Sequence, residues 1–449
     1  MTFLYHLAIH CYVLAIRIAA IFNPKARQWI RGRRGIFDEL KRTFAGERLA
    51  NSRCVWVHAA SLGEFEQGRP IIEQIKQKYP DTKIILTFFS PSGYEIRKDY
   101  EGADFVLYLP ADTPRNARRF LDIVQPDLAI FIKYEFWYNY LNTLKLRHTP
   151  TLLVSAIFRE KQIFFRPYGQ FFKRMLTCFE HIFVQDDFSL KLLEKNDITH
   201  ASVAGDTRMD SVYQRSRNPK QFPLIEAFKG ENDLLVCGST WREDEVWLLY
   251  FLNKTQSSPP PTAKGGDFSL RERLSTSLSP PLEGAGGRTV QKTIIAPHDI
   301  SESHIQYILS NLKIKAVRYS QANLETIQEA EVLIIDNIGM LSSIYQYGKW
   351  AYIGGGFGAS IHNTQEAFVY GLPVVFGPKY HKFKEAVDLL AEGGGFVVHS
   401  RAEFGTVFEK LQDENTYKTA SKICLDYVNQ NKGATAKIMS YIHPYFIDA

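Results

Sequence analysis

The sequence predicts a two-domain α/β protein in which each domain is a parallel sheet covered by helices. Short apolar segments alternate with amphipathic segments along the chain, and this series occurs twice, separated by a polar stretch at residues 206–232. Strands that are buried on both faces of a parallel sheet have nearly continuous apolar sequences. A chain of 449 residues is also too long for a single compact core.

The first series contains seven expected strands, which are rich in β-branched and aromatic residues. They are CVWVHAA (54–60), KIILTFFS (83–90), FVLYLP (105–110), LAIFIK (128–133), TLLVSA (151–156), HIFVQ (181–185) and ASVAG (201–205). Amphipathic segments lie between them, for example FEQGRPIIEQIKQKYP (65–80) and TPRNARRFLDIVQP (113–126). This alternation favours a parallel sheet with helices on both faces.

The second series repeats the pattern with seven more expected strands. They are DLLVCGS (233–239), KTIIAP (292–297), IKAVRYS (314–320), AEVLIID (330–336), WAYIGGG (350–356), PVVFGP (373–378) and GFVVHS (395–400). Two series of similar length predict two Rossmann-like domains that face each other, and the cleft between them is the expected site.

Changes in composition give the expected boundaries. We expect an N-terminal segment at residues 1–35, a first domain at 36–215 and a second domain at 216–449. Residues 254–290 are dense in Pro, Ser and Gly and lack apolar periodicity. They are interpreted as a disordered surface insertion in the second domain, without a catalytic role.

Residues 3–22 are the candidate membrane segment. Their length is close to that of a span, but His6, His10 and Arg17 weaken the case for a transmembrane helix. The alternative is an amphipathic helix on the domain or on a membrane surface. Residues 23–35, NPKARQWIRGRRG, carry five basic residues and no acid, which suits a phosphate-rich partner. We expect membrane association with this basic side in the cytoplasm, and spanning is left open.

The bulk composition is that of a globular protein, with 45% hydrophobic residues and a formal net charge of +6. Because the basic excess is confined mainly to the N-terminus and no recognised module occurs, nucleic acid is the least expected partner. Five scattered cysteines without a CxxC pair indicate free thiols in a reducing compartment and no structural zinc. Asp186 and Asp187 lack a third metal ligand and are interpreted as a helix cap.

Three strand–turn–helix junctions in the second series are candidates for a nucleotide-phosphate site. They are Gly238-Ser239-Thr240, Asn337-Ile338-Gly339, and the glycine run 354–358 followed by Asn363-Thr364-Gln365-Glu366. Glycines allow the backbone to approach a ligand, and helix N-termini bind phosphate, although such turns are also ordinary packing devices. The run has no P-loop signature and does not match a dinucleotide fingerprint, so neither a P-loop ATPase nor NAD binding is expected.

The segment HAASLGEFE (58–66) leaves an expected strand and places Glu64 and Glu66 where the next helix begins. Helix N-termini favour acidic side chains, so either residue can be a first-turn stabiliser. The other interpretation is a catalytic base at the carboxyl end of a parallel strand, where open α/β sheets bind their ligands.

Seven motifs, in their order along the chain, resemble those of the Kdo (3-deoxy-D-manno-octulosonate) transferases of lipopolysaccharide synthesis. They are WVHAASLGE, YLPAD, KYEFW, GDTRMD, GSTWREDE, GGGFGASIHNTQEAFVYGLPVVFGP and HKFKEA, and the resemblance covers nearly the whole chain except residues 254–290. It implies a GT-B fold, an N-terminal membrane anchor and an active site on the cytoplasmic face of the inner membrane. The implied reaction is inverting transfer of Kdo from CMP-Kdo to a hydroxyl of a lipid A precursor, with no metal and no cofactor.

The resemblance also implies the roles of individual residues. The S-x-G-E motif is Ser61-Leu62-Gly63-Glu64, so Glu64 rather than Glu66 is the expected general base. Ser61, Gly63 and Glu135 are expected on the acceptor side. The expected donor-binding residues are Ser239, Thr240, Pro297, His298, Gly339, Met340, Gly355, Gly356, Asn363 and Glu366.

Three positions depart from the family pattern. Pro297 and His298 stand where an Arg-His pair is expected, Met340 replaces the Glu of a G-E-L turn, and Lys133-Tyr134-Glu135 replaces an E-T-E run. These departures concern single contacts, not the reaction class. An inverting transfer needs a base for the acceptor hydroxyl, and helix N-termini with glycine-rich backbone can stabilise the departing phosphate.

Two alternatives remain. One is another GT-B enzyme, such as a nucleotide-sugar epimerase or a transferase with a different acceptor, which would have less use for a basic, aromatic, lipid-facing first domain. The other is a membrane-tethered binding protein that has lost catalysis, against which the intact S-x-G-E motif argues.

Overall fold

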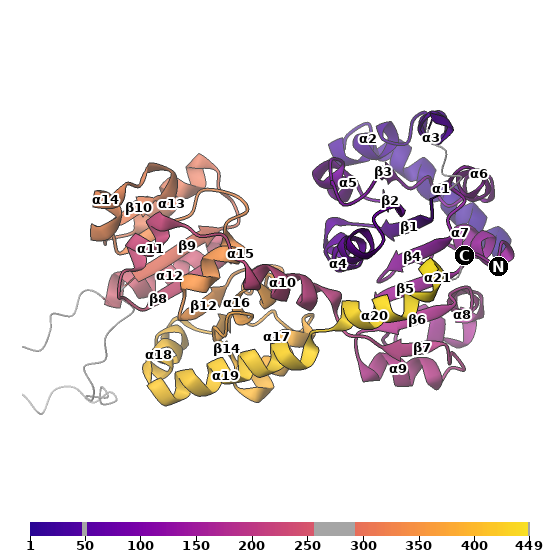
Figure 1. Ribbon diagram of the computed structural model, residues 1–449. Coiled ribbons are helices and arrows are strands. Elements are labelled where there is room, and N and C mark those ends of the chain that lie inside the picture. The colour runs from indigo at the N-terminus through magenta and orange to yellow at the C-terminus, as the bar shows by residue number, and fades with distance from the viewer. Residues whose placement is uncertain (47–51, 256–291, 448–449) are drawn as a thin grey trace, which may run out of the picture. The chain divides into compact units, whose positions relative to one another are not determined.

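The computed structural model describes residues 1–46, 52–255 and 292–447 (Figure 1). The chain divides into two compact units, the first comprising Met1–Ser211 with Asn431–Ala449 and the second Val212–Gln430. Within the described residues each unit contains one parallel seven-stranded sheet, which confirms the predicted α/β class with two sheets. The predicted insertion at 254–290 lies, from residue 256 on, outside the described residues.

The strands of the first unit lie where the apolar segments predict them. They are β1 (Cys54–Ala59), β2 (Lys83–Phe88), β3 (Phe105–Tyr108), β4 (Leu128–Ile132), β5 (Thr151–Ala156), β6 (His181–Val184) and β7 (Ala201–Val203). The helices are α1 (Thr2–Ala19), α2 (Pro24–Arg31), α3 (Ile36–Gly46), α4 (Leu62–Lys78), α5 (Pro91–Arg97), α6 (Pro114–Val124), α7 (Tyr138–Leu146), α8 (Gln170–Leu176), α9 (Asp187–Glu194), α20 (Ala434–Ile442) and α21 (Pro444–Ile447), with α10 (Thr207–Arg217) crossing into the second unit. The Asp186 side chain accepts from the backbone N–H of Ser189, which confirms the predicted cap of α9.

The strand order of the first sheet is β3-β2-β1-β4-β5-β6-β7. The chain therefore builds outward from β1 in one direction and then, from β4, in the other. Ligands of open α/β sheets bind at such a reversal, beside the carboxyl ends of the two strands. The segments that follow β1 and β4 consequently form the expected site of this unit.

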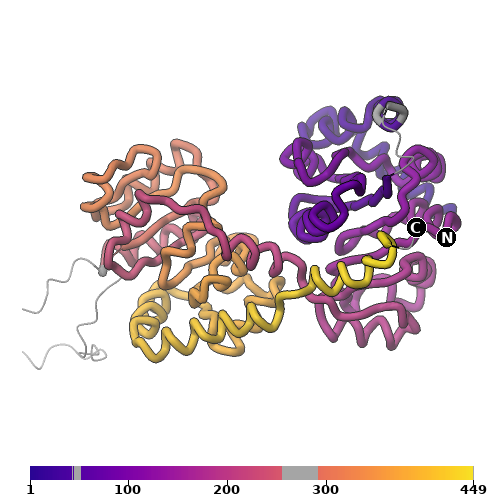
Figure 2. The backbone as a smooth tube through the Cα atoms, in the orientation of Figure 1, coloured from indigo at the N-terminus to yellow at the C-terminus, as the bar shows by residue number. Residues whose placement is uncertain are grey.

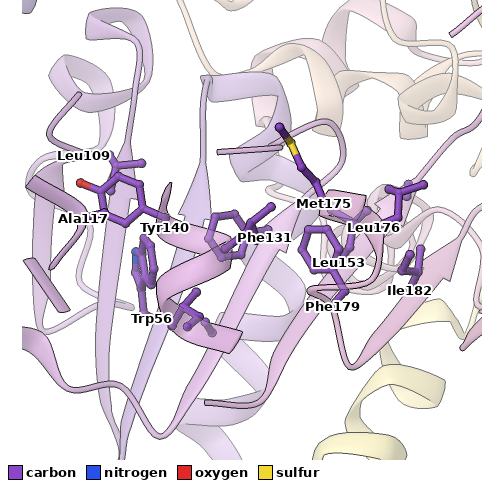
Figure 3. Close-up of a cluster of buried hydrophobic side chains, with 14 of the residues drawn as sticks. Trp56, Leu109, Ala117, Phe131, Tyr140, Leu153, Met175, Leu176, Phe179 and Ile182 are labelled. Carbon is purple, nitrogen blue, oxygen red and sulfur yellow. The ribbon is translucent and has the colours of Figure 1, made fainter. Parts of the chain in front are cut away.

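Side chains of the first sheet alternate between two cores. Trp56 and Phe131 point to a cluster that includes Tyr140 and residues of α8 (Figure 3). Val57 and Ile130 point to the opposite face, against α4 and α20. Because both faces are covered, every residue of β1 is buried, as the apolar pattern predicts.

The last helices return to the first unit (Figure 2). Ala434, Ile438, Met439 and Ile442 of α20 join the core beside α4. Asp210 accepts hydrogen bonds from the backbone N–H groups of Gly433 (2.5 Å) and Thr435 (2.6 Å) at the start of α20. The structure thus divides the chain differently from the expected second domain at 216–449. A short amphipathic tail does not encode which of two sheets it will cover.

The strands of the second unit are β8 (Leu234–Thr240), β9 (Lys292–Pro297), β10 (Ala316–Arg318), β11 (Val332–Ile334), β12 (Trp350–Ile353), β13 (Val374–Phe376) and β14 (Gly395–Val397). Its helices are α11 (Pro223–Lys229), α12 (Arg242–Thr255), α13 (Glu302–Asn311), α14 (Leu324–Glu329), α15 (Leu341–Ile344), α16 (Gln365–Phe368), α17 (Lys384–Glu392), α18 (Arg401–Gln412) and α19 (Glu414–Asn431). The strand order is β10-β11-β9-β8-β12-β13-β14, so the direction reverses between β8 and β12.

One residue of the basic N-terminal segment is structural. The guanidinium of Arg33 lies 3.8 Å from the ring centre of Trp29 and 4.9 Å from that of Phe89. It donates to the carbonyl oxygens of Leu109 (2.8 Å), Phe89 (2.7 Å) and Trp29 (3.1 Å). Arg33 therefore joins the N-terminal helices to the ends of β2 and β3, while Lys25, Arg27, Arg31 and Arg34 are exposed.

Candidate functional site

Glu64 lies in the first turn of α4, just beyond the carboxyl end of β1. Its Oε2 accepts from the backbone N–H of Ser61 at 2.9 Å and from the Ser61 hydroxyl at 3.1 Å. This is the return bond of a capping box, so Glu64 does stabilise the helix start. The bond occupies one carboxylate oxygen, and among the described residues we find no hydrogen bond to the other, Oε1. Glu64 can therefore cap the helix through Oε2 and still accept a proton on Oε1.

The environment of Glu64 favours its protonated form. Burial raises the pKa of its carboxyl above the ordinary value, and the negative charge of Glu135 raises it further. The hydrogen bonds from Ser61 and the nearby His58 oppose this shift without cancelling it. A carboxylate with a raised pKa is a stronger base toward a hydroxyl.

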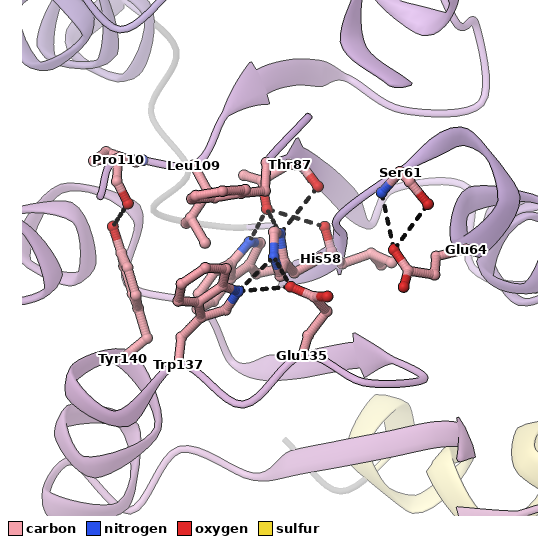
Figure 4. A network of polar contacts seen from close by, with 12 residues as sticks. His58, Ser61, Glu64, Thr87, Leu109, Pro110, Glu135, Trp137 and Tyr140 are labelled. Carbon is pink, nitrogen blue, oxygen red and sulfur yellow. Dashed lines mark hydrogen bonds and ion pairs between the residues drawn. The ribbon is translucent and has the colours of Figure 1, made fainter. Parts of the chain in front are cut away.

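Glu135 follows β4, and a set of polar contacts fixes it in the core (Figure 4). Its Oε2 accepts from Trp137 Nε1 at 2.6 Å and lies 3.0 Å from His58 Nε2. On the far side of the imidazole, His58 Nδ1 lies 2.8 Å from Thr87 Oγ1, which accepts from Trp56 Nε1 at 2.8 Å. His58 Nδ1 also lies 3.1 Å from the Thr87 carbonyl oxygen, and Trp137 Nε1 also lies 3.1 Å from His58 Nε2. A ring proton on Nδ1 would face Thr87, and one on Nε2 would face Glu135.

The predicted base Glu64 lies here together with two of the three residues predicted for the acceptor side, Ser61 and Glu135. Gly63 is exposed, and a side chain at its position would meet open space, so packing does not account for this glycine. Sequence reasoning missed His58 and Trp137. Both lie inside the motifs WVHAASLGE and KYEFW, but a single histidine or tryptophan in such a segment is usually interpreted as a packing residue.

In the second unit, the residues that follow β8, β9 and β12 are neighbours because these strands are paired. Asp244 organises this edge: its carboxylate accepts from Tyr352 Oη (2.8 Å), from Gly355 N (2.7 Å) and from Trp241 N (2.9 Å). The buried Thr240 donates to Glu245 Oε1 at 2.9 Å. Ser239 adopts a left-handed backbone with φ of 54°, a strain that clusters at functional sites.

Three rings gather at this edge. Trp241 stacks on His298 with ring centres 4.3 Å apart, and His298 stacks on His362 at 4.7 Å. Trp241 Nε1 donates to His362 Nε2 at 2.8 Å. Burial, and then His298, lower the pKa of His362 to about 4. His298 was predicted for the donor side, whereas Trp241 and His362 were missed because lone aromatic residues carry no spacing signal.

The glycine run is explained largely by packing. A Cβ on Gly354 would lie 2.3 Å from Ser239 O, and one on Gly356 would lie 2.6 Å from Gly377 Cα. Gly355 has a φ of +90°, which favours glycine. These glycines let the ends of β8, β12 and β13 approach one another, so a ligand is not needed to account for them.

The other predicted donor residues differ in accessibility. Pro297 is buried and pairs with Thr240 at the end of β9, and Met340 is buried with its sulfur 3.6 Å from Asn337 Nδ2. Gly339 is exposed, and Asn363 and Glu366 are half-buried at the start of α16. The side chains of Pro297 and Met340 are therefore buried. In the described part of the chain, no group of three or more His, Cys, Asp or Glu residues could hold a metal ion.

The helix α1 has the length and hydropathy of a membrane-spanning helix. It lies along the first unit, since Tyr5 donates to Asp112 (2.6 Å), His6 Nε2 lies 2.9 Å from Asn139 Oδ1, and Tyr12 stacks on Phe89. Its outer side exposes large apolar side chains. They are Phe3, Leu4, Leu7, Leu14 and Ile18, followed by Ile21 and Phe22.

Comparison with known proteins agrees with this architecture. The UDP-GlcNAc 2-epimerase from Neisseria meningitidis, solved bound to UDP-GlcNAc, superposes with a TM-score of 0.57 over 87% of this chain and 99% of that chain, at 14% identity. This likeness shows the fold, which is the two-unit α/β arrangement named GT-B. The fold class is therefore GT-B, and Glu64 and Glu135 lie at the strand switch point of its first sheet.

Comparison at the level of sequence is more specific. The profile of the 3-deoxy-D-manno-octulosonic-acid transferases (Kdo transferases) matches residues 32–211. The chain is 27% identical to the 3-deoxy-D-manno-octulosonic acid transferase of Aquifex aeolicus, over 84% of this chain and 91% of that protein. It is 24% identical to that of Haemophilus influenzae, over 96% of this chain and 94% of that protein. The chain is thus a glycosyltransferase that is similar to the Kdo transferases along most of its length.

Proposed function

We propose that this enzyme transfers Kdo from CMP-Kdo to a hydroxyl of a lipid A precursor, with inversion at the anomeric carbon and with Glu64 as the general base. The observation that carries the proposal is the Glu64 carboxylate itself. It is half-buried at the carboxyl end of β1, its pKa is raised by burial and by Glu135, and its Oε1 has no hydrogen bond among the described residues.

In the proposed step the acceptor oxygen attacks the anomeric carbon of Kdo while Glu64 takes the hydroxyl proton. A new C–O bond forms to the acceptor, the bond from the anomeric carbon to the phosphate oxygen breaks, and CMP leaves with the electron pair. A positioned base contributes about 10²- to 10⁴-fold to such a step. The protein supplies the base and orientation, and no bound metal is invoked.

We assign the donor to the carboxyl edge of the second sheet. Ser239, His298 and the backbone at Gly339, Gly355 and Gly356 are the proposed contacts, together with Asn363 and Glu366. Thr240 is buried and bonded to Glu245, so we assign it a supporting role. For Pro297 and Met340, whose side chains are buried, we propose contacts through the backbone.

We further propose that α1 lies on the cytoplasmic face of the inner membrane and does not cross it. Tyr5, His6 and Tyr12 fasten one side of the helix to the first unit, and the apolar side chains on the other side are free to enter lipid. The exposed bases Lys25, Arg27, Arg31 and Arg34 suit anionic headgroups.

The test is transfer of labelled Kdo from CMP-Kdo, generated in situ, to a lipid A precursor in detergent. We expect transfer by the wild type and a loss of at least about 100-fold in Glu64→Gln. The matched control is Glu66→Gln on the same helix, whose carboxylate pairs with Arg69 and Arg97. Equal transfer by wild type and Glu64→Gln would reject Glu64 as the base, and no transfer by a wild type that binds CMP would reject the donor–acceptor assignment.

A further inference from the structure

Two ring nitrogens converge on one oxygen of Glu135. Trp137 Nε1 lies 2.6 Å and His58 Nε2 3.0 Å from Oε2, and His58 and Glu135 are only 0% and 6% exposed. Among the described residues we find no hydrogen bond to the second oxygen, Oε1. The Glu135 carboxylate is thus anchored through Oε2, while Oε1 has no hydrogen bond among the described residues.

The two rings are fixed by their surroundings. His58 is the fifth residue of β1, and its ring is held from behind by Thr87, whose hydroxyl accepts from Trp56. The Trp137 ring packs on Phe89 with ring centres 4.5 Å apart. Neither ring can turn away from Glu135 without disturbing the aromatic core.

Glu64 has the complementary arrangement. Its Oε2 is occupied by Ser61, and its charge is close enough to that of Glu135 for the two carboxyls to influence each other. In Figure 4 the Glu135 carboxylate lies between the rings of His58 and Trp137 on one side and Glu64 on the other. Each carboxylate is anchored by one oxygen.

Resting on the proposed role of Glu64 as the base, we propose that His58 and Trp137 are positioning residues of the transfer site. They hold Glu135 by one oxygen, so that its carboxylate stands beside Glu64 and strengthens it as a base. Neither residue touches the substrate. A carboxylate next to a second carboxylate resists ionisation, and the basicity of Glu64 therefore depends on how firmly Glu135 is held in place.

The first variant is Trp137→Phe, which keeps an aromatic ring and removes only the donor. We expect kcat to fall by about 10- to 100-fold, the worth of a hydrogen bond to a charged group, while the KM for CMP-Kdo is unchanged. The acidic limb of the pH profile of kcat/KM should move to lower pH. Without the hydrogen bond from Trp137, the Glu135 carboxylate is held less firmly beside Glu64 and raises the pKa of Glu64 less than it does in the wild type. Glu135→Gln moves the limb in the same direction.

The matched control is Tyr140→Phe. The Tyr140 hydroxyl is a buried donor to Pro110 O at 3.1 Å, and its ring lies 5.6 Å from Trp56 in the same core, but it contacts neither carboxylate. Tyr140→Phe should lower stability without moving the limb. If it moves the limb as far as Trp137→Phe does, the effect is general loosening of the core and the proposal fails.

A double variant tests whether Trp137 acts through Glu135. In a Glu135→Gln background, Trp137→Phe should produce no further movement of the limb. A second movement of equal size overturns the proposal. If Trp137→Phe does not fold, His58→Gln provides the same comparison.

A substrate-free measurement separates this inference from the proposed function. The protein is labelled with ¹³C-carboxyl glutamate and titrated by infrared spectroscopy. The difference between the spectra of wild type and Glu64→Gln reports the protonation of Glu64 directly. If the wild type transfers no Kdo but Trp137→Phe still lowers the pKa at which Glu64 titrates, the reaction is misassigned and the positioning inference stands. If the wild type transfers Kdo and the pKa of Glu64 is the same in Trp137→Phe as in the wild type, the inference is overturned.

Discussion

The indole N–H of Trp241 donates to Nε2 of His362 at 2.8 Å, and this bond fixes the imidazole in one neutral form. A nitrogen that accepts a hydrogen bond carries no proton, so the ring proton is on Nδ1. The stacked ring of His298 stands on the same edge of the sheet. The proposed donor edge therefore presents a neutral histidine.

Trp241→Phe should raise the pKa of His362 from about 4, because the neutral form loses the hydrogen bond that stabilises it. The measurement is an NMR titration of the histidine ring signals, assigned with His362→Gln. His399→Gln, at an exposed histidine of the same unit, is the assignment control. An unchanged titration would show that burial alone keeps His362 neutral.

The same group makes stability depend on pH. The pKa of His362 is lowered in the fold from 6.5 to about 4, so between these pH values the unfolded chain binds a proton that the folded chain does not. This contribution is fully present above pH 6.5 and is lost as the pH falls toward 4. Denaturant unfolding at several pH values measures this contribution. As the pH falls, the free energy of unfolding should decrease less for His362→Gln than for the wild type. Parallel curves would contradict the assignment.

Asp210→Ala should destabilise the first unit by about 1–3 kcal/mol. The carboxylate accepts from two N–H groups at the start of α20, and helix N-termini leave such donors unpaired otherwise. Urea unfolding measures the loss. Ser440→Ala, an exposed change on the same helix whose hydroxyl bonds only within it, should have little effect.

Gly354→Ala should lower stability of the second unit by about 1–3 kcal/mol. The new methyl group would lie 2.3 Å from Ser239 O and 2.6 Å from Thr240 Cα, both backbone atoms that cannot move aside freely. Gly358→Ala is the control within the same run, because its nearest neighbour is 3.5 Å away. Equal thermal melting of the two variants would reject the packing explanation of the run.

Arg33→Lys should cost at least about 2 kcal/mol, because a single ammonium cannot replace a planar group that donates to three carbonyls and lies over aromatic rings. Arg34→Lys, one residue along and exposed, should be neutral. Denaturant midpoints compare the two. If both variants are neutral, Arg33 belongs to the membrane-facing charge and not to the core.

The outer side of α1 should bind anionic vesicles of phosphatidylethanolamine and phosphatidylglycerol. Replacing both Leu14 and Ile18, which are 56% and 57% exposed, by Glu should weaken cosedimentation by more than about tenfold. Leu146→Glu, at a residue 72% exposed on α7, is the control. Equal loss in the control would indicate a general charge effect.

The sequence by itself determined the α/β class, the positions of all strands of the two described sheets and the segment that carries Glu64. These features are local: a buried parallel strand needs a continuous apolar run, and the turn after it needs small or capping residues. The family motifs added the expected roles of Glu64 and Glu135.

Only the tertiary structure decided which residues meet. His58 and Trp137 read as core in the sequence, and β1 and β4 bring them onto one oxygen of Glu135 because those strands are neighbours at the switch point of the sheet. Trp241 and His362 meet in the same way beyond β8 and β12. The return of α20 to the first unit and the burial of Arg33 also depend on contacts between distant segments, which no local pattern encodes.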